Sequence, residues 1–305
     1  MPPNESTVGD WRGDLVESLE ARPGVALEVS DAGVTVIQEN TRTTIEEQTV
    51  AGRDGGQYRA LRLETVLRGN LAMPGSARTR AFQLNPRNAI GSLTGSLDGR
   101  GSTREGLSLV SRVCIDREVP WHPTGRQLTC LVALEAGTAL FDRPPAANRQ
   151  LNRAGLGVWR NGIQSIPGVD PQAWRVTRRS ADSLTALPVG EGIPPGARAS
   201  LFVGAGIAAI GPGFEFVLQL PGAIDDAAAL AEQCDALNAL ECQVATGAPH
   251  IGAWSATEQG GCRYQVRVPA RFGRRLPDLP RQLLETAADR TTTALALLAG
   301  QDRGG

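Results

Sequence analysis

A repeat within the chain places the strongest constraint on its fold. The stretch Arg126 to Leu140, RQLTCLVALEAGTAL, returns as Arg281 to Leu295, RQLLETAADRTTTAL, and seven of the fifteen paired positions are identical. Two unrelated segments of ordinary composition would share about one position. The 305 residues are also enough for two domains of about 150 residues each. We therefore expect two copies of one module.

Further matches support the duplication because they follow the same order along both halves. Each match joins a residue of the first half to one 153 or 155 positions later: Leu61/Phe214, Leu63/Phe216, Leu67/Leu220, Leu84-Asn85/Leu237-Asn238 and Arg112-Val113/Arg267-Val268. Alternation of apolar residues predicts that the first three pairs line the core face of a strand. The change of offset predicts a small insertion in the second copy of the following hairpin.

The pattern of each half predicts an α+β fold in which an antiparallel sheet is flanked by helices. Helical spacing predicts a helix over residues 8–21 and closing helices from Arg126 and Arg281. Alternation predicts the strands 25–29, 34–38, 43–50, 58–68, 91–98, 106–116, 199–203, 244–254 and 262–270. The expected order in each module is helix, strands, helix, two strands, helix.

Domain boundaries follow from the same comparison. The first module is expected over residues 8–142 and the second over 172–299. Residues 143–171 carry Pro-Pro, Pro-Gly and several Asn and Gly residues, together with apolar residues, which predicts a linker or a packed connection. At the start of the second module, Trp174-Arg175 is interpreted as the counterpart of Trp11-Arg12.

Charge and hydropathy exclude several classes of protein. The formal net charge of -1 gives no long-range attraction to nucleic acid or to an anionic membrane. Apolar runs are too short to span a membrane, and residues 1–10 do not have the pattern of a signal peptide. We therefore expect a cytoplasmic protein. The five cysteines are odd in number and unevenly spaced, so we expect reduced thiols rather than a disulfide framework.

The predicted order of elements resembles the bacterial type III secretion chaperone-like fold, including YbjN-like proteins, here in two tandem copies. The strand holding Leu61 and Leu63, the hairpin ending at Arg112-Val113 and the helix from Arg126 carry this resemblance. It implies a non-enzymatic protein that binds another protein or peptide segment. Family members often act as dimers, so two copies in one chain imply an internal pseudo-dimer.

Few residues offer a catalytic or metal-binding constellation. Cys234, Cys242, His250 and Cys262 have the donor atoms that zinc prefers, but their spacing lacks the short Cys-x2-Cys motif, so the set is a weak metal candidate. The stretch 204–213, GAGIAAIGPG, matches no nucleotide-binding motif and predicts a hairpin or strand bend. We predict no cofactor and no catalytic residue.

The leading hypothesis is therefore a protein-binding or chaperone-like protein. One alternative is a structural subunit of a larger bacterial assembly or homo-oligomer, in which the duplication supplies two similar contacts. The other is a metal-dependent or cysteine enzyme that uses the cysteines and His250 of the second half.

Overall fold

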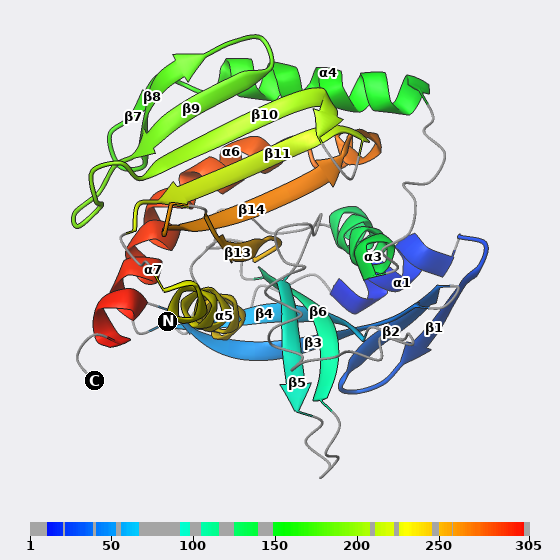
Figure 1. The fold of residues 1–305 in the computed structure, drawn as a ribbon. Coiled ribbons are helices and arrows are strands. Elements are labelled where there is room, and N and C mark those ends of the chain that lie inside the picture. Colours follow the sequence, from blue (N-terminus) through cyan, green and yellow to red (C-terminus); the bar gives the residue numbers. More distant parts are fainter. Residues whose placement is uncertain are drawn as a thin grey trace, which may run out of the picture.

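Two seven-stranded sheets with flanking helices form the protein in the computed structural model (Figure 1). The structure describes residues 11–20, 22–38, 41–52, 56–66, 92–97, 105–115, 125–139, 149–207, 211–222, 226–245, 250–257 and 259–301. In Figure 1 the second sheet lies above the first, and α1, α3 and α5 lie between them. The fold is α+β, as predicted.

The first half contains two described helices and six strands. These are α1 (Trp11–Glu20), β1 (Val25–Val29), β2 (Gly33–Gln38), β3 (Thr41–Gly52), β4 (Gln57–Val66), β5 (Ser92–Leu97), β6 (Glu105–Cys114) and α3 (Gly125–Ala139). The sheet has the order β1-β2-β3-β4-β6-β5, and all of these pairs are antiparallel. Leu84-Asn85, expected at the end of a helix, lie outside the described residues.

The second half follows the same plan. Its elements are α4 (Arg149–Ser165), β7 (Val169–Asp170), β8 (Trp174–Arg179), β9 (Ser183–Pro188), β10 (Arg198–Ile207), β11 (Gly211–Leu220), α5 (Ala227–Gln243), β12 (Val244–Ala245), β13 (Ala253–Ala256), β14 (Cys262–Pro269), η2 (Ala270–Phe272), α6 (Leu279–Glu285) and α7 (Ala287–Gln301). The sheet has the order β13-β14-β11-β10-β9-β8-β7, so its six main strands are arranged as in the first half. The Gly-rich stretch 204–213 connects β10 and β11 as an antiparallel pair, which confirms the predicted hairpin.

Strand register confirms the duplication. Leu61 of β4 pairs with Val113 of β6, and their matched residues, Phe214 of β11 and Val268 of β14, pair with each other. All four side chains are fully buried. The two sequence offsets inferred from the repeat therefore describe one sheet geometry that occurs twice.

The repeat that opens the sequence comparison forms the closing helices, but the two copies differ. In the first copy it is the single helix α3, whereas in the second it divides at Thr286 into α6 and α7. The Thr286 hydroxyl donates to the main-chain oxygens of Gln282 and Leu283, which accommodates the break. The predicted apolar stripe is confirmed at Leu128, Leu131, Val132, Leu283, Leu284, Ala287 and Ala294, which are buried.

The segment between the copies contains a helix that belongs with the second sheet. Helix α4 precedes the first long strand of its sheet, as α1 does, and Trp159 packs on Phe214 with ring centroids 5.4 Å apart. The Trp159 indole also donates to the Leu276 oxygen at 2.8 Å. Proposing Trp174-Arg175 as the counterpart of Trp11-Arg12 is wrong. Trp174 begins strand β8, whereas Trp11 begins helix α1.

A glycine contact fixes how closely α4 approaches the chain after β14. A Cβ atom at Gly155 would lie 1.6 Å from the main-chain oxygen of Ala270, and one at Gly273 would lie 2.5 Å from the oxygen of Gly155. Glycine is required at both positions because the backbones touch there. By contrast, a Cβ at Gly157 would meet nothing within 4 Å.

The two halves are joined by a segment of the second half that pairs with the first sheet. We call residues 244–245 and 250–256 the crossing segment. Strand β12 pairs with residues 51–52 of β3 in parallel, and His250 exchanges two main-chain hydrogen bonds with Arg112 of β6 at 2.9 and 2.8 Å. Residues 253–256 then return to the second sheet as β13. Buried residues of both halves form one continuous apolar core.

Candidate functional site

The structure separates the residues that the sequence proposed as a metal site. Cys234 of α5 and Cys262 of β14 lie together, with their sulfur atoms 3.7 Å apart. His250 instead faces Glu241, and its ring lies 5.9 Å from that of Tyr264. The side chain of Cys242 lies outside the described residues. Among described side chains, no group of three or more His, Cys, Asp or Glu residues could hold a metal ion.

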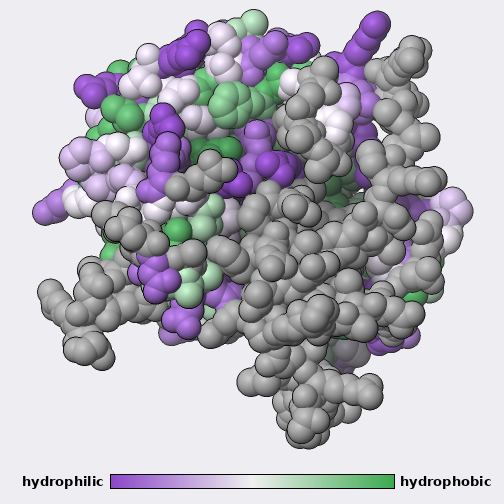
Figure 2. Space-filling view, in the orientation of Figure 1, coloured by the Kyte–Doolittle hydropathy of each residue, from purple (hydrophilic) through white to green (hydrophobic). Residues whose placement is uncertain are grey.

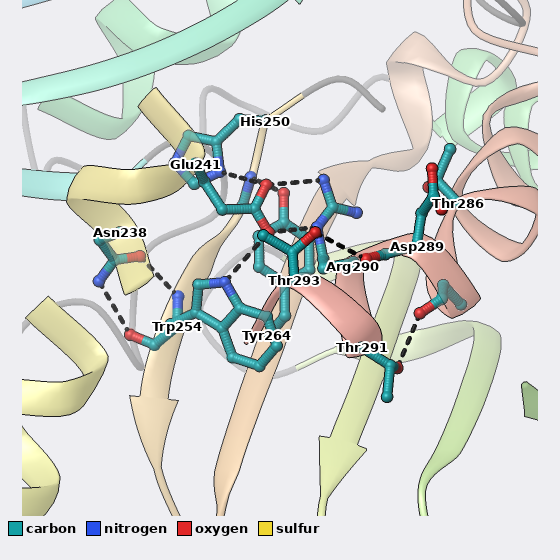
Figure 3. A network of polar contacts seen from close by, with 12 residues as sticks. Asn238, Glu241, His250, Trp254, Tyr264, Thr286, Asp289, Arg290, Thr291 and Thr293 are labelled. Atoms are coloured by element: carbon teal, nitrogen blue, oxygen red, sulfur yellow. Dashed lines mark hydrogen bonds and ion pairs between the residues drawn. The ribbon is translucent and has the colours of Figure 1, made fainter. Parts of the chain in front are cut away.

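A buried charge network lies beside the crossing segment instead. Glu241, near the end of α5, accepts hydrogen bonds from Arg290 of α7 at 2.7 and 3.2 Å. The Trp254 indole donates to the same carboxylate at 3.1 Å, and His250 Nδ1 lies 3.4 Å from it. Figure 3 shows these side chains converging from α5, α7 and the crossing segment. The Arg290 guanidinium also lies over the Tyr264 ring, 4.0 Å from its centre.

Electrostatics hold the carboxylate in its charged form. Burial alone would raise the pKa of Glu241, but Arg290 and His250 outweigh burial and bring that pKa below its ordinary value. The pKa of Tyr264 is raised, first because the phenol is buried and also because Glu241 is near. Glu241 and Arg290 therefore form an ion pair inside the protein, with Tyr264 as a neutral phenol above it.

The network also fixes the crossing segment. The Tyr264 hydroxyl oxygen accepts hydrogen bonds from the main-chain N–H groups of Ile251 and Gly252 at 3.1 and 2.8 Å. A Cβ atom at position 252 would lie 2.3 Å from the Gln265 oxygen, so only glycine allows this approach. Because these residues follow His250 directly, the network sets the path of the chain between the two sheets.

One further contact closes an edge of the second sheet. The Asn238 carboxamide accepts from the Trp254 N–H at 2.8 Å and donates to the Trp254 oxygen at 3.2 Å (Figure 3). A side-chain amide therefore pairs with β13 in the way that a neighbouring strand would. The sequence comparison matched Leu237-Asn238 to Leu84-Asn85, but it did not predict that Asn238 binds the main chain of Trp254.

Glu241 and Arg290 were not anticipated from the sequence. They are separated by 49 residues and belong to no motif. Both side chains are at most 2% exposed, as is that of His250. The arrangement therefore stabilises the joint between the halves and does not present these groups to a ligand at the surface.

The accessible feature is an open strand edge in the first sheet. Within the described residues β1 pairs only with β2, whereas the equivalent strand β8 is covered on its outer side by β7. The Val176 N–H also donates to the Gly168 oxygen at 2.8 Å, which extends that cover. Within the described residues, this edge of the sheet is therefore open in the first half and covered in the second.

The outer face of the second sheet is a second accessible surface. One row across it contains Ser183, Phe202, Glu215 and Arg267, in the order of the paired strands. Phe202 is 40% exposed, and Arg267 and Glu215 form an ion pair at 2.8 Å. Figure 2 shows hydrophilic and hydrophobic side chains interspersed over this sheet, in the upper part of the view.

Comparisons with known proteins found no matching family model, no matching curated protein and no matching solved structure. The structure itself defines the class: a two-module α+β protein with two antiparallel sheets and flanking helices. No helix among the described residues has the length and hydropathy needed to cross a membrane.

Proposed function

We propose that the chain is a non-enzymatic, chaperone-like protein that binds another polypeptide, with its two modules forming a pseudo-dimer. The partner is an extended segment with alternating apolar residues, and it adds as a new strand to β1. The contrast between the open edge at β1 and the covered edge at β8 carries this proposal.

Main-chain geometry supports strand addition at β1. Ser30 and Gly33 exchange two hydrogen bonds at the end of the β1–β2 hairpin. Pairs in an antiparallel ladder alternate between bonded and non-bonded, so Glu28 and Ala26 are directed to β2. The N–H and C=O groups of Leu27 and Val29 are therefore directed to the open edge, where a further strand would bind them.

The side chains of β1 leave this edge accessible. The strand reads VALEV, and its one charged residue, Glu28, pairs with Arg42 of β3 at 2.6 Å. Val29 is 59% exposed. Natural proteins protect sheet edges with charges, bulges or covering segments, and β8 has all three: β7, a register shift after Val176 and the exposed Arg175.

Addition of a strand is an established mode of peptide recognition. Main-chain hydrogen bonds supply affinity, and alternate side chains supply specificity. A partner strand beside β1 would place its apolar residues next to Val25 and Leu27, which pack against the core. Its other residues would lie on the outer face beside Ala26 and Glu28, so a small or basic residue fits there.

The test is to select extended decapeptides from a display library against the full chain and to measure binding by fluorescence anisotropy. The V29K variant places a charge on the open edge and is expected to weaken binding at least tenfold. The V169K variant is the matched control, because Val169 is 58% exposed and lies on the covering strand β7. It is expected to bind as the parent does.

Hydrogen exchange identifies the binding mode. The amides of Leu27 and Val29 should exchange quickly in the free protein and slowly with bound peptide, whereas those of Ala26 and Glu28 should be slow in both. Equal binding by both lysine variants, or unchanged exchange at Leu27 and Val29, would refute the proposal. If β1 instead pairs with a second copy, sedimentation will show an oligomer that V29K dissociates, which favours an assembly subunit over a chaperone-like protein.

A further inference from the structure

Two buried cysteines lie in contact at the base of the crossing segment. Cys234 is on α5 and Cys262 is the first residue of β14, and their side chains come within 3.7 Å. Both are free thiols and are at most 3% exposed. A disulfide requires a sulfur separation of about 2.05 Å. The two sulfur atoms would have to approach each other by about 1.7 Å to form this bond.

The position of the pair gives it a structural consequence. The chain between the two cysteines contains the end of α5, strand β12, His250 and β13. It therefore includes every residue of the crossing segment that pairs with the first sheet. A covalent bond between the cysteines would close this loop at its base.

We propose that Cys234 and Cys262 are a redox-responsive dithiol, which a peroxide converts into a disulfide that locks the joint between the two halves. The proposal is independent of the binding function assigned to β1. Its ligand class is a hydroperoxide, with hydrogen peroxide as the simplest member.

The two sulfur atoms have different roles. The Cys234 thiol donates its hydrogen to the Cys262 sulfur, and this hydrogen bond lowers the pKa of Cys262 although burial opposes it. The same hydrogen bond, together with burial, raises the pKa of Cys234. We assign Cys262 as the attacking thiolate and Cys234 as the resolving thiol because Cys262 directly follows the turn between β13 and β14, whereas Cys234 lies within helix α5.

The reaction balances in two steps. The Cys262 thiolate attacks one peroxide oxygen, the O–O bond breaks, and a sulfenic acid and hydroxide form. The Cys234 sulfur then attacks the Cys262 sulfur, the S–O bond breaks, and the leaving oxygen departs as water with the thiol proton. In total, two thiols lose two electrons and two protons, and one hydrogen peroxide becomes two water molecules.

The route for the peroxide is the hairpin between β13 and β14. Cys262 follows its tip directly, and Gln259 at this tip is exposed. The turn is held by main-chain bonds between Thr257, Gly260 and Gly261 at 2.7 to 3.2 Å. We infer that the peroxide reaches Cys262 when this end of the hairpin opens locally, together with the pairing of Cys262 to Ala256 and Leu220.

Peptide mapping of the full chain tests the proposal. Cleavage after glutamate, at Glu232, Glu241, Glu258 and Glu285, places Cys234, Cys242 and Cys262 in three different peptides. After treatment with hydrogen peroxide and alkylation of free thiols, the peptide 233–241 is expected to be joined to 259–285. Dithiothreitol should separate them. Recovery of both cysteines as alkylated thiols, oxidation of Cys262 beyond the sulfenic acid without a cross-link, or a cross-link to Cys242 would each refute it.

Variants test the assigned roles. In C234S, Cys262 should stop at the sulfenic acid and be labelled by dimedone, whereas in C262S, Cys234 should remain a thiol. C130S is the matched control, since Cys130 is also buried but lies on α3, and it should form the cross-link as the parent does. Fast oxidation of Cys234 in C262S would overturn the assignment. In the oxidised protein the His250 amide should exchange at least tenfold more slowly, and an unchanged rate would show that the bond does not lock the joint.

Discussion

Removing Arg290 tests the role of the buried charge network most directly. The R290M variant keeps most of the side-chain volume but deletes both hydrogen bonds to Glu241, at 2.7 and 3.2 Å, and the contact with the Tyr264 ring at 4.0 Å. Glu241 remains buried, with Trp254 and His250 as its remaining partners.

The expected cost follows from burial. Breaking a buried ion pair by removing one partner costs about 3–5 kcal/mol, because the other charge is left in a medium that solvates it poorly. The side chains of Arg290 and Glu241 are 0% and 2% exposed, so solvent does not screen the loss. We therefore expect R290M to lower the free energy of unfolding at pH 7 by about 4 kcal/mol.

The stability difference between the parent and R290M should also change with pH in a definite direction. In the parent the pKa of Glu241 is lowered, so the carboxylate contributes stability above its unfolded pKa of about 4.3, and loses it as the pH falls towards the folded value. Without Arg290, the largest interaction that opposes burial is lost, so the pKa of Glu241 should rise relative to the parent, and protonation then relieves the poorly compensated charge. The stability difference between parent and R290M should therefore shrink as the pH is lowered from 7 to 4.

Urea unfolding, followed by tryptophan fluorescence at several pH values, measures these differences. R281M is the matched control, because Arg281 pairs with Glu285 at 2.7 Å but its side chain is 63% exposed. An exposed pair of this kind contributes at most about 0.5 kcal/mol. A loss below about 1 kcal/mol for R290M, or a loss that stays constant from pH 7 to 4, would refute our account of the network.

Further variants and the oxidised protein test the packing. G155A should destabilise the protein by about 3 kcal/mol or more because its Cβ meets main-chain oxygen at 1.6 Å, whereas G157A should raise helix stability by up to about 1 kcal/mol; thermal unfolding compares them. N238A should cost about 2–3 kcal/mol and speed exchange of the Trp254 amide, since the edge of β13 loses two hydrogen bonds. Oxidation of Cys234 and Cys262, which are 28 residues apart, should add about 3–4 kcal/mol in urea unfolding, and C234S should gain nothing.

The sheets were predictable because their residues repeat with a period of two. The strand predicted over residues 58–68 is β4 (Gln57–Val66). Its counterpart in the second half, β11, was found by matching residues between the two copies. Matching the two copies predicted that β11 corresponds to β4 and β14 to β6, whereas the pairing register of these strands came from the structure. Local alternation and internal repetition therefore predict many of the strands, whereas their order within each sheet came from the structure.

The contacts between the halves had no such pattern. The strand predicted over residues 244–254 includes β12 and His250, but the pattern assigned it to a hairpin with residues 262–270 and not to the first sheet. Pairing of Glu241 with Arg290 depends on how two helices pack after folding, because Glu241 lies near the end of α5 and Arg290 near the start of α7. The sequence showed apolar residues within α4, but the neighbouring Pro and Gly residues led us to predict a linker or packed connection over residues 143–171 instead of a helix. The sequence analysis named Cys234 and Cys262 among four candidate zinc ligands, but it did not predict that these two contact each other.

The crossing segment also sets the order of events during synthesis. Residues 51–52 of β3 and Arg112 of β6 cannot complete their main-chain pairing until residues 244–250 have been made. At about 5–20 residues per second, the interval after β4 emerges is on the order of 10–40 s. During that time the first sheet has unpaired strand ends, which are open to incorrect association. The first half of this chain is therefore completed only after much of the second half has been made, although it is made first.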